Sequence, residues 1–185
     1  MILCGLVCAL LPSPTQFTGE EIFARVMSKA KLNGWAKMPI GELVGKVGTE
    51  LLGTPYVGFT LEGNVDVEVC TVNLSGLDCV TFFESSLGFA RIITKGLSTT
   101  QALRDEVRFT RYRGGKLTDY TSRLHYTLDW MFDNQEKGVV VPVTDFLPEA
   151  KPFESGDAIA ESLNRNCVPP RSIKRLSVPP LALVW

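Results

Sequence analysis

The segment from Asp78 to about Lys95 constrains the fold most, because it is the longest stretch whose apolar residues recur at helical spacing. These apolar residues are Val80, Phe83, Leu87, Ala90 and Ile93. Asp78 stands where an N-cap is expected, and Gly96 follows the last turn. The pattern predicts a helix over 78–95 in which a thiol, Cys79, lies in the first turn.

Similar patterns predict further helices and two strands. A capping box at Thr18-Gly19-Glu20-Glu21 predicts a helix that runs to about Lys31. Apolar spacing also predicts helices over 40–52, 99–112 and 120–136. Alternating valines over 65–74 indicate a strand, and 139–146 reads as a strand interrupted at Pro142.

Composition limits the chain to an ordinary globular class. Its 185 residues suffice for one domain with a sizeable core, and 45% of them are hydrophobic against 21% charged. A net charge of -1 argues against a nucleic-acid partner. The five cysteines have neither C-x-x-C pairs nor histidine partners at zinc-binding spacing, and their odd number argues against a disulfide framework.

Cys79 is the strongest candidate in this sequence for a residue with a chemical role. In the first turn of a helix, unpaired backbone amides and the positive end of the helix dipole stabilise a thiolate, which is the nucleophilic form of cysteine. A small core residue is the structural alternative, since buried cysteines are common and inert. Cys70 lies among the valines of the expected strand, which indicates core packing.

The residues around Cys79 resemble the signature of NlpC-type cysteine peptidases, the papain-like enzymes that cut bacterial cell-wall peptides. The matching residues are Gly53, Pro55, Tyr56, Gly58, Asp78 and Cys79. Residues 78–91 and 112–140 are similar to the N-acetylmuramoyl-L-alanine amidase-like branch of this superfamily, and the resemblance covers about residues 18–153. It implies an α+β, papain-like NlpC-type fold whose N-terminal helical half packs on a partial antiparallel sheet.

The resemblance also implies an activity and roles for individual residues. The reaction would be hydrolysis of the amide between N-acetylmuramic acid and L-alanine in peptidoglycan fragments, without a metal or organic cofactor. Cys79 matches the nucleophile, and Tyr56 matches a tyrosine whose hydroxyl helps to bind the oxyanion. Ser122, Arg123 and Tyr126 are expected to bind muramoyl or peptide carboxylate groups, although an amphipathic helix needs polar residues in any case. The implied location is the periplasm or cell envelope of a bacterium.

The catalytic base departs from the family pattern. Family members activate the cysteine with a histidine on a downstream strand, whereas the single histidine here, His125, precedes that region. On the expected helix His125 shares a face with Asp129, so it is the candidate base with Asp129 orienting its ring. Two other interpretations stay open: an inactive truncated homologue that still binds muropeptides, or a structural envelope protein with a buried Cys79.

The two ends of the sequence differ from its central part. Residues 1–16 form an apolar run closed by two prolines, which indicates a secretory signal; a misassigned start codon or a docked apolar N-terminus are the alternatives. Membrane contact is expected only through this signal or through a lipid on Cys8, whose neighbours fit an acylation site poorly. We expect the N-terminal part of an amidase-like domain over 17–153 and an atypical, proline-rich tail over 154–185.

Overall fold

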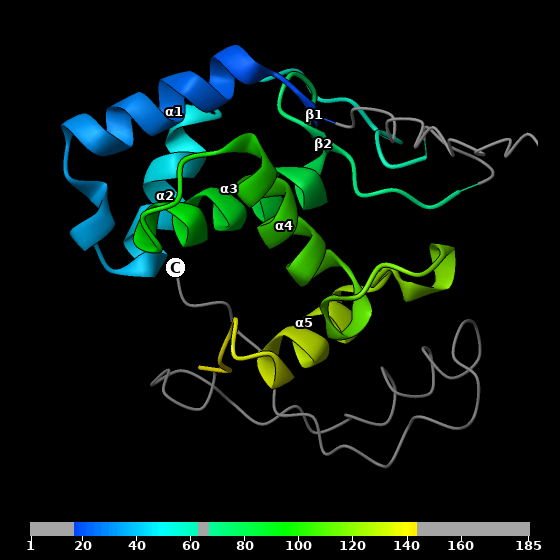
Figure 1. The fold of residues 1–185 in the computed structure, drawn as a ribbon. Coiled ribbons are helices and arrows are strands. Elements are labelled where there is room, and N and C mark those ends of the chain that lie inside the picture. The colour runs from blue at the N-terminus through cyan, green and yellow to red at the C-terminus, as the bar shows by residue number, and fades with distance from the viewer. Residues whose placement is uncertain (1–16, 63–66, 144–185) are drawn as a thin grey trace, which may run out of the picture.

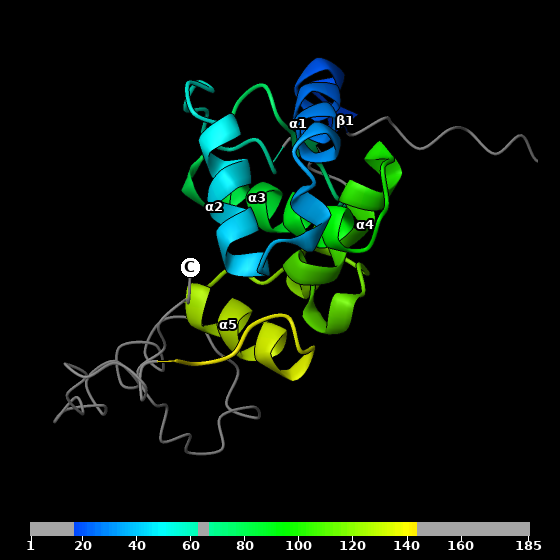
Figure 2. The same cartoon turned by 90° about the vertical axis from the view of Figure 1, so that its left-hand side faces the viewer.

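Helix α3 (Cys79–Thr94) lies at the centre of the molecule, between α2 and α4 (Figure 2). The computed structural model describes residues 17–62 and 67–143. In chain order its elements are β1 (Phe17–Thr18), α1 (Glu20–Leu32), η1 (Trp35–Lys37), α2 (Ile40–Glu50), β2 (Val72–Asn73), α3 (Cys79–Thr94), α4 (Thr100–Arg111), η2 (Arg113–Gly115), η3 (Tyr120–Ser122) and α5 (Thr127–Glu136). Helix α1 passes over one end of this arrangement, and α5 follows α4 at the other (Figure 1).

The start of α3 agrees with the prediction, and its cause is local. The Asp78 Oδ1 atom accepts a hydrogen bond of 2.7 Å from the Thr81 amide, and the Thr81 hydroxyl accepts one of 2.9 Å from the Asp78 amide. This reciprocal capping box satisfies two amides that a helix otherwise leaves unpaired. Cys79 is therefore the first residue of the helix.

Helix α3 is buried on more sides than its apolar pattern indicated. Every residue from Glu84 to Ala90 is buried, because α2 and α4 pack on different faces. Gly88 permits the close approach of α4, since a Cβ atom there would lie only 2.9 Å from the Leu103 Cδ1 atom. Val80, near the start of the helix, stays 48% exposed.

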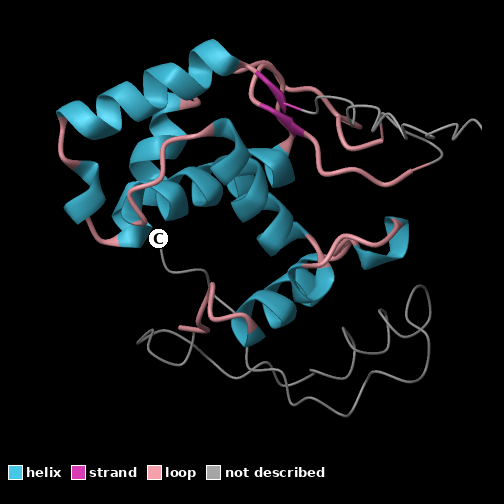
Figure 3. Cartoon of the chain, viewed as in Figure 1, coloured by secondary structure: helices cyan, strands magenta, loops and turns pink. Residues whose placement is uncertain are grey.

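The sheet differs from the prediction in direction and in size. Strands β1 and β2 have two residues each and run parallel, with Phe17 opposite Val72 (Figure 3). The expected antiparallel sheet is thus absent from the described residues, and of the strand expected over 65–74 only β2 forms there. The predicted Thr18 cap is also wrong. Pairing with β2 keeps Thr18 extended, and Gly19, at φ 96°, precedes α1 without a side-chain cap.

The helix predicted over 120–136 forms only in its second half, from Thr127. Asp119 caps the single turn η3, and Arg123 then has extended backbone that forms an antiparallel bridge with Tyr112. Leu124 continues this contact, because its amide donates to the Arg111 carbonyl at 2.9 Å. Tertiary pairing thus overrides a helical pattern that local sequence favours.

One hydrophobic cluster joins the helices. Its largest fully buried apolar members are Tyr112, Phe89, Leu43, Leu51, Leu74, Ile92, Leu103, Val26, Val47, Val72 and Val107. Among residues 17–62 and 67–143 no helix is both long and apolar enough to cross a bilayer. The strand expected over 139–146 does not form over 139–143, and its remainder, like 1–16 and 154–185, lies outside the described residues.

Candidate active site

Cys79 is exposed at the beginning of α3. This overturns the interpretation in which Cys79 is a buried structural thiol. The other cysteine in the described part of the chain, Cys70, is buried as expected, and its burial raises the pKa of the thiol. Of the two thiols that the structure describes, only Cys79 is therefore open to a substrate.

Tyr56 is held next to the start of α3 by backbone pairing. The Leu77 amide donates to the Pro55 carbonyl at 3.1 Å, and the Val57 amide donates to the Leu77 carbonyl at 3.1 Å. Gly76 makes room for this contact, because a Cβ atom there would lie 2.7 Å from the Val57 Cγ2 atom. The Tyr56 side chain is 78% exposed. The pairing thus places the Tyr56 segment beside Leu77, two residues before Cys79.

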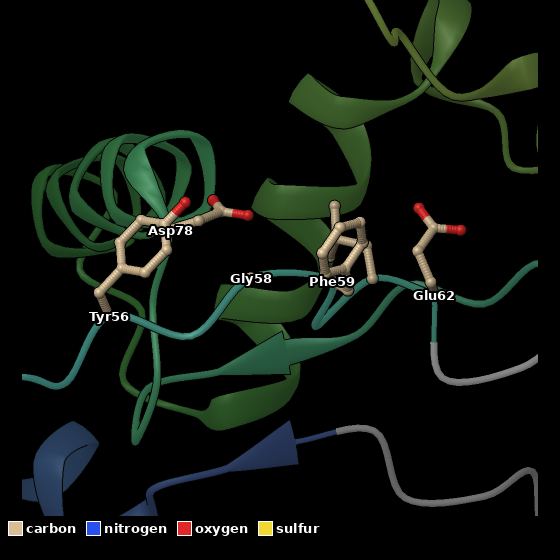
Figure 4. Close-up of a pocket in the computed structure, with 6 residues that line it drawn as sticks. Tyr56, Gly58, Phe59, Glu62 and Asp78 are labelled. Atoms are coloured by element: carbon tan, nitrogen blue, oxygen red, sulfur yellow. The ribbon is translucent and has the colours of Figure 1, made fainter.

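A cavity of about 260 Å³ opens beside this segment. Its lining residues are Tyr56, Gly58, Phe59, Leu61, Glu62 and Asp78. In Figure 4, Tyr56 and Asp78 stand at one end of the cavity and Glu62 at the other, with Phe59 between them. The cavity therefore combines exposed aromatic rings with two carboxylates, next to the helix end that carries Cys79.

His125 does not lie on a helix and does not face Asp129 as predicted. It precedes α5, where its Nε2 atom lies 2.9 Å from the Tyr120 carbonyl oxygen and its ring centroid 4.4 Å from that of Tyr120. Asp129 instead forms a two-pronged ion pair with Arg113, at 3.0 and 2.5 Å. Within the described residues no hydrogen bond or ring contact joins His125 to Cys79.

Arg123 is buried, although it was expected to bind substrate carboxylates. Its side chain is 4% exposed, and its guanidinium pairs with the chain's own glutamates, with Nη2 2.7 Å from Glu62 Oε1 and Nε 3.5 Å from Glu68 Oε1. Its Nη1 atom donates to the Leu61 carbonyl at 3.3 Å. The ring of Tyr120 covers the same guanidinium, at 4.8 Å. Arg123 therefore fastens the segment before residue 63 to the body of the protein.

The other two residues expected to bind substrate have different surroundings. The Ser122 hydroxyl donates to the Asp119 carbonyl at 2.6 Å and accepts the Thr118 amide at 3.2 Å, so it closes the loop around η3. Tyr126 lies at the start of α5 with 42% of its surface exposed. Of the three residues, Tyr126 is the one whose side chain is most open to solvent.

A buried polar network behind the site was not predicted from the sequence. Glu84 on α3 accepts Arg111 Nε at 2.8 Å, and Arg111 also donates to the Thr71 carbonyl at 2.7 Å. Burial alone would lower the pKa of Arg111, but the Glu84 carboxylate outweighs it and raises the pKa. Burial, together with a 2.7 Å hydrogen bond to Glu68, raises the pKa of the Tyr112 hydroxyl. The network ties α3, α4 and the segment before β2 into one unit.

Among residues 17–62 and 67–143 no cluster of three or more His, Cys, Asp or Glu side chains has the arrangement of a metal site.

Comparison with known proteins gives one family and several related structures. The model of a family described as N-acetylmuramoyl-L-alanine amidase-like matches residues 46–184. Two structures named N-acetylmuramoyl-L-alanine amidase from Bacteroides uniformis are 26% and 27% identical, with TM-scores of 0.54 and 0.51. They cover 68% and 64% of this chain, which spans 59% and 57% of theirs. A Legionella pneumophila protein, 22% identical with a TM-score of 0.53, shares the fold over 68% of this chain and 39% of its own. No curated protein matches.

Proposed function

Because the chain belongs to the N-acetylmuramoyl-L-alanine amidase-like family, we propose that it acts as a cysteine amidase on the bond between N-acetylmuramic acid and L-alanine in peptidoglycan. The observation that carries the proposal is the exposed thiol of Cys79 at the first position of α3, beside the Tyr56 segment. A papain-like, NlpC-type scaffold and a location in the periplasm or cell envelope are parts of the same proposal. They are supported by the thiol at a helix start and by where peptidoglycan is found.

In the proposed reaction the Cys79 Sγ atom attacks the carbonyl carbon of the muramoyl amide. A carbon–sulfur bond forms, the carbon–nitrogen bond breaks, and the amine of L-alanine leaves after it gains a proton. Water then hydrolyses the thioester, which releases the muramoyl acid and restores the thiol. The Tyr56 hydroxyl is the proposed hydrogen-bond donor to the oxygen that becomes negative during each step, and the exposed position of Tyr56 supports this role.

His125 remains the proposed base, but one observation favours a second function. Its Nε2 atom lies at the Tyr120 carbonyl, and Asp129, which was expected to orient its ring, is paired with Arg113. A thiol without a base to accept its proton and return it to the leaving amine would lose several orders of magnitude in rate. The second candidate is therefore a muropeptide-binding protein that uses the same cavity without hydrolysis.

Hydrolysis of N-acetylmuramoyl-L-alanyl-D-isoglutamine by the full chain separates the two functions. Mass spectrometry would follow release of the free dipeptide by wild type, Cys79→Ala, His125→Ala and the matched control Cys70→Ala. We expect Cys79→Ala to lose at least about a thousandfold in rate, while Cys70→Ala, checked for folding by circular dichroism, keeps the rate. Turnover that survives Cys79→Ala would refute the cysteine mechanism. Turnover that survives His125→Ala would remove His125 from it, and binding without turnover in wild type would favour the second function.

A further inference from the structure

Phe59 combines two features that each carry a cost in free energy. Its side chain is 87% exposed, so a large apolar ring is left in water. Its backbone has φ 59°, and it is the one non-glycine residue with positive φ among residues 17–62 and 67–143. Side chains of this size rarely adopt that conformation, and such strain persists where the surrounding structure enforces it. The chain therefore holds this ring outward at the edge of the cavity.

The segment that carries Phe59 is fixed at both ends. At its beginning, the backbone on either side of Tyr56 pairs with Leu77 through two hydrogen bonds of 3.1 Å. At its end, the buried Arg123 binds the Leu61 carbonyl and the Glu62 carboxylate. Between these points a turn closes when the Glu62 amide donates to the Phe59 carbonyl at 3.1 Å. The backbone that carries the exposed ring is thus preorganised, which lowers the entropy cost of binding a ligand.

We propose that Phe59, together with Tyr56, forms a subsite for the pyranose ring of the muramoyl group. This proposal rests on the proposed function, which places the muramoyl carbonyl at Cys79. The carbon–hydrogen face of a pyranose is apolar and flat enough to cover an aromatic ring, so its binding would remove both from water.

The charges at the cavity favour a sugar over the peptide stem. The muramoyl carboxyl is bound as an amide in the substrate, so the sugar is uncharged and presents hydroxyl donors. The Glu62 carboxylate lines the cavity, and 48% of its side chain is exposed. It can accept a hydrogen bond from a sugar hydroxyl while its Oε1 atom accepts one from Arg123. Glu62 and Asp78 would instead repel the carboxylates of a peptide stem.

The test compares two ligands on the full chain carrying Cys79→Ala, so that binding is measured without turnover. The ligands are N-acetylmuramoyl-L-alanyl-D-isoglutamine and N-lactoyl-L-alanyl-D-isoglutamine, which keeps the amide but lacks the sugar. Titration calorimetry gives both dissociation constants. We expect the sugar to improve affinity about tenfold, and Phe59→Gly to abolish this difference while Phe59→Trp retains it. Leu97→Ala, at an exposed apolar residue away from the cavity, serves as the control and should keep it.

Glycine tolerates the positive φ at position 59, so Phe59→Gly should fold with an unchanged or higher Tm. A lower Tm in Phe59→Gly would mean that the ring packs on the protein, and this would overturn the proposal. Equal preference for the sugar with and without Phe59 would overturn it as well, as would failure of both ligands to bind. Absence of turnover in wild type, with a sugar preference that depends on Phe59, would instead reject the amidase proposal and keep the subsite.

Discussion

Replacing Glu84 with glutamine should unfold the protein more readily than any exposed substitution, because it leaves a buried charge without its partner. Glu84 Oε2 lies 2.8 Å from both Nε and Nη2 of Arg111, and the two side chains are 2% and 3% exposed. Glutamine keeps the shape and removes the charge, while Arg111 keeps only neutral acceptors such as the Thr71 carbonyl. Breaking one side of such a pair costs about 3 to 5 kcal/mol.

That loss is a large share of the 5 to 15 kcal/mol that typically separates folded from unfolded states. Urea unfolding followed by circular dichroism should show a lower midpoint with an unchanged slope, and Tm should fall by roughly 10 °C. Glu106→Gln is the matched control on α4. Glu106 is also buried, but its partner Lys95 is 47% exposed and keeps access to water, so this change should cost less than Glu84→Gln.

The double variant Glu84→Leu/Arg111→Met removes both charges at once. It should recover most of the stability that Glu84→Gln loses, since apolar side chains of similar volume often replace a buried pair without penalty. Equal losses of stability in Glu84→Gln and Glu106→Gln, or a double variant no more stable than Glu84→Gln, would show that the unpaired Arg111 charge carries no such penalty.

Three further predictions concern the site and the acid stability. Gly76→Ala should displace Val57 and hence Tyr56, which would lower kcat/KM by about tenfold or more; an unchanged value would show that the segment can shift freely. Asp78→Ala should lower the free energy of unfolding, measured in urea, by about 1 kcal/mol because α3 loses its cap. An unchanged free energy of unfolding would show that the capping box does not stabilise the protein. Burial alone would raise the pKa of Glu106, but hydrogen bonds from its two basic partners lower it below the usual 4.5. Its contribution to stability is thus present above that pH and lost as pH falls through the lowered pKa, so Glu106→Gln should flatten this part of the stability–pH curve.

The sequence predicted helices best where the signals that end them are local. Asp78 and Thr99 cap α3 and α4 through hydrogen bonds to amides three residues ahead, and both helices begin within one residue of the prediction. A cap of this kind depends only on neighbouring residues, so it can be read without knowledge of the fold. The position of Cys79 at the start of a helix followed from the same signal.

The prediction failed where distant contacts decide the backbone. Residues 120–126 carry a helical pattern, but Arg123 is drawn to Glu62, which lies 61 positions earlier in the chain. The strand expected over 65–74 failed for a similar reason, because its partner is the two-residue β1 at the start of the described chain. Neither partner can be identified from the spacing of apolar residues, so periodicity alone gave the wrong element.

The link between the Tyr56 segment and the start of α3 came only from the family resemblance. In the structure this segment pairs with Leu77, and the missing side chain of Gly76 makes room for Val57. A glycine after a serine reads as an ordinary turn in the sequence, and its close contact with Val57 becomes visible only in the fold. Motif similarity proposed the candidate site, and packing shows why a glycine stands at position 76, outside the matched residues.

Arg123 connects the unpredicted part of the fold to the site itself. The same guanidinium that keeps residues 120–126 out of a helix also holds the Leu61 carbonyl and the Glu62 carboxylate at the edge of the cavity. A change at Arg123 would therefore alter the cavity without removing a group that touches substrate. Lysine at this position keeps the charge but loses the planar fork that binds two acceptors together. Its effect on activity would pass through the 56–62 segment, so Arg123 belongs to the architecture that positions Tyr56 and Phe59 rather than to the surface that meets the ligand.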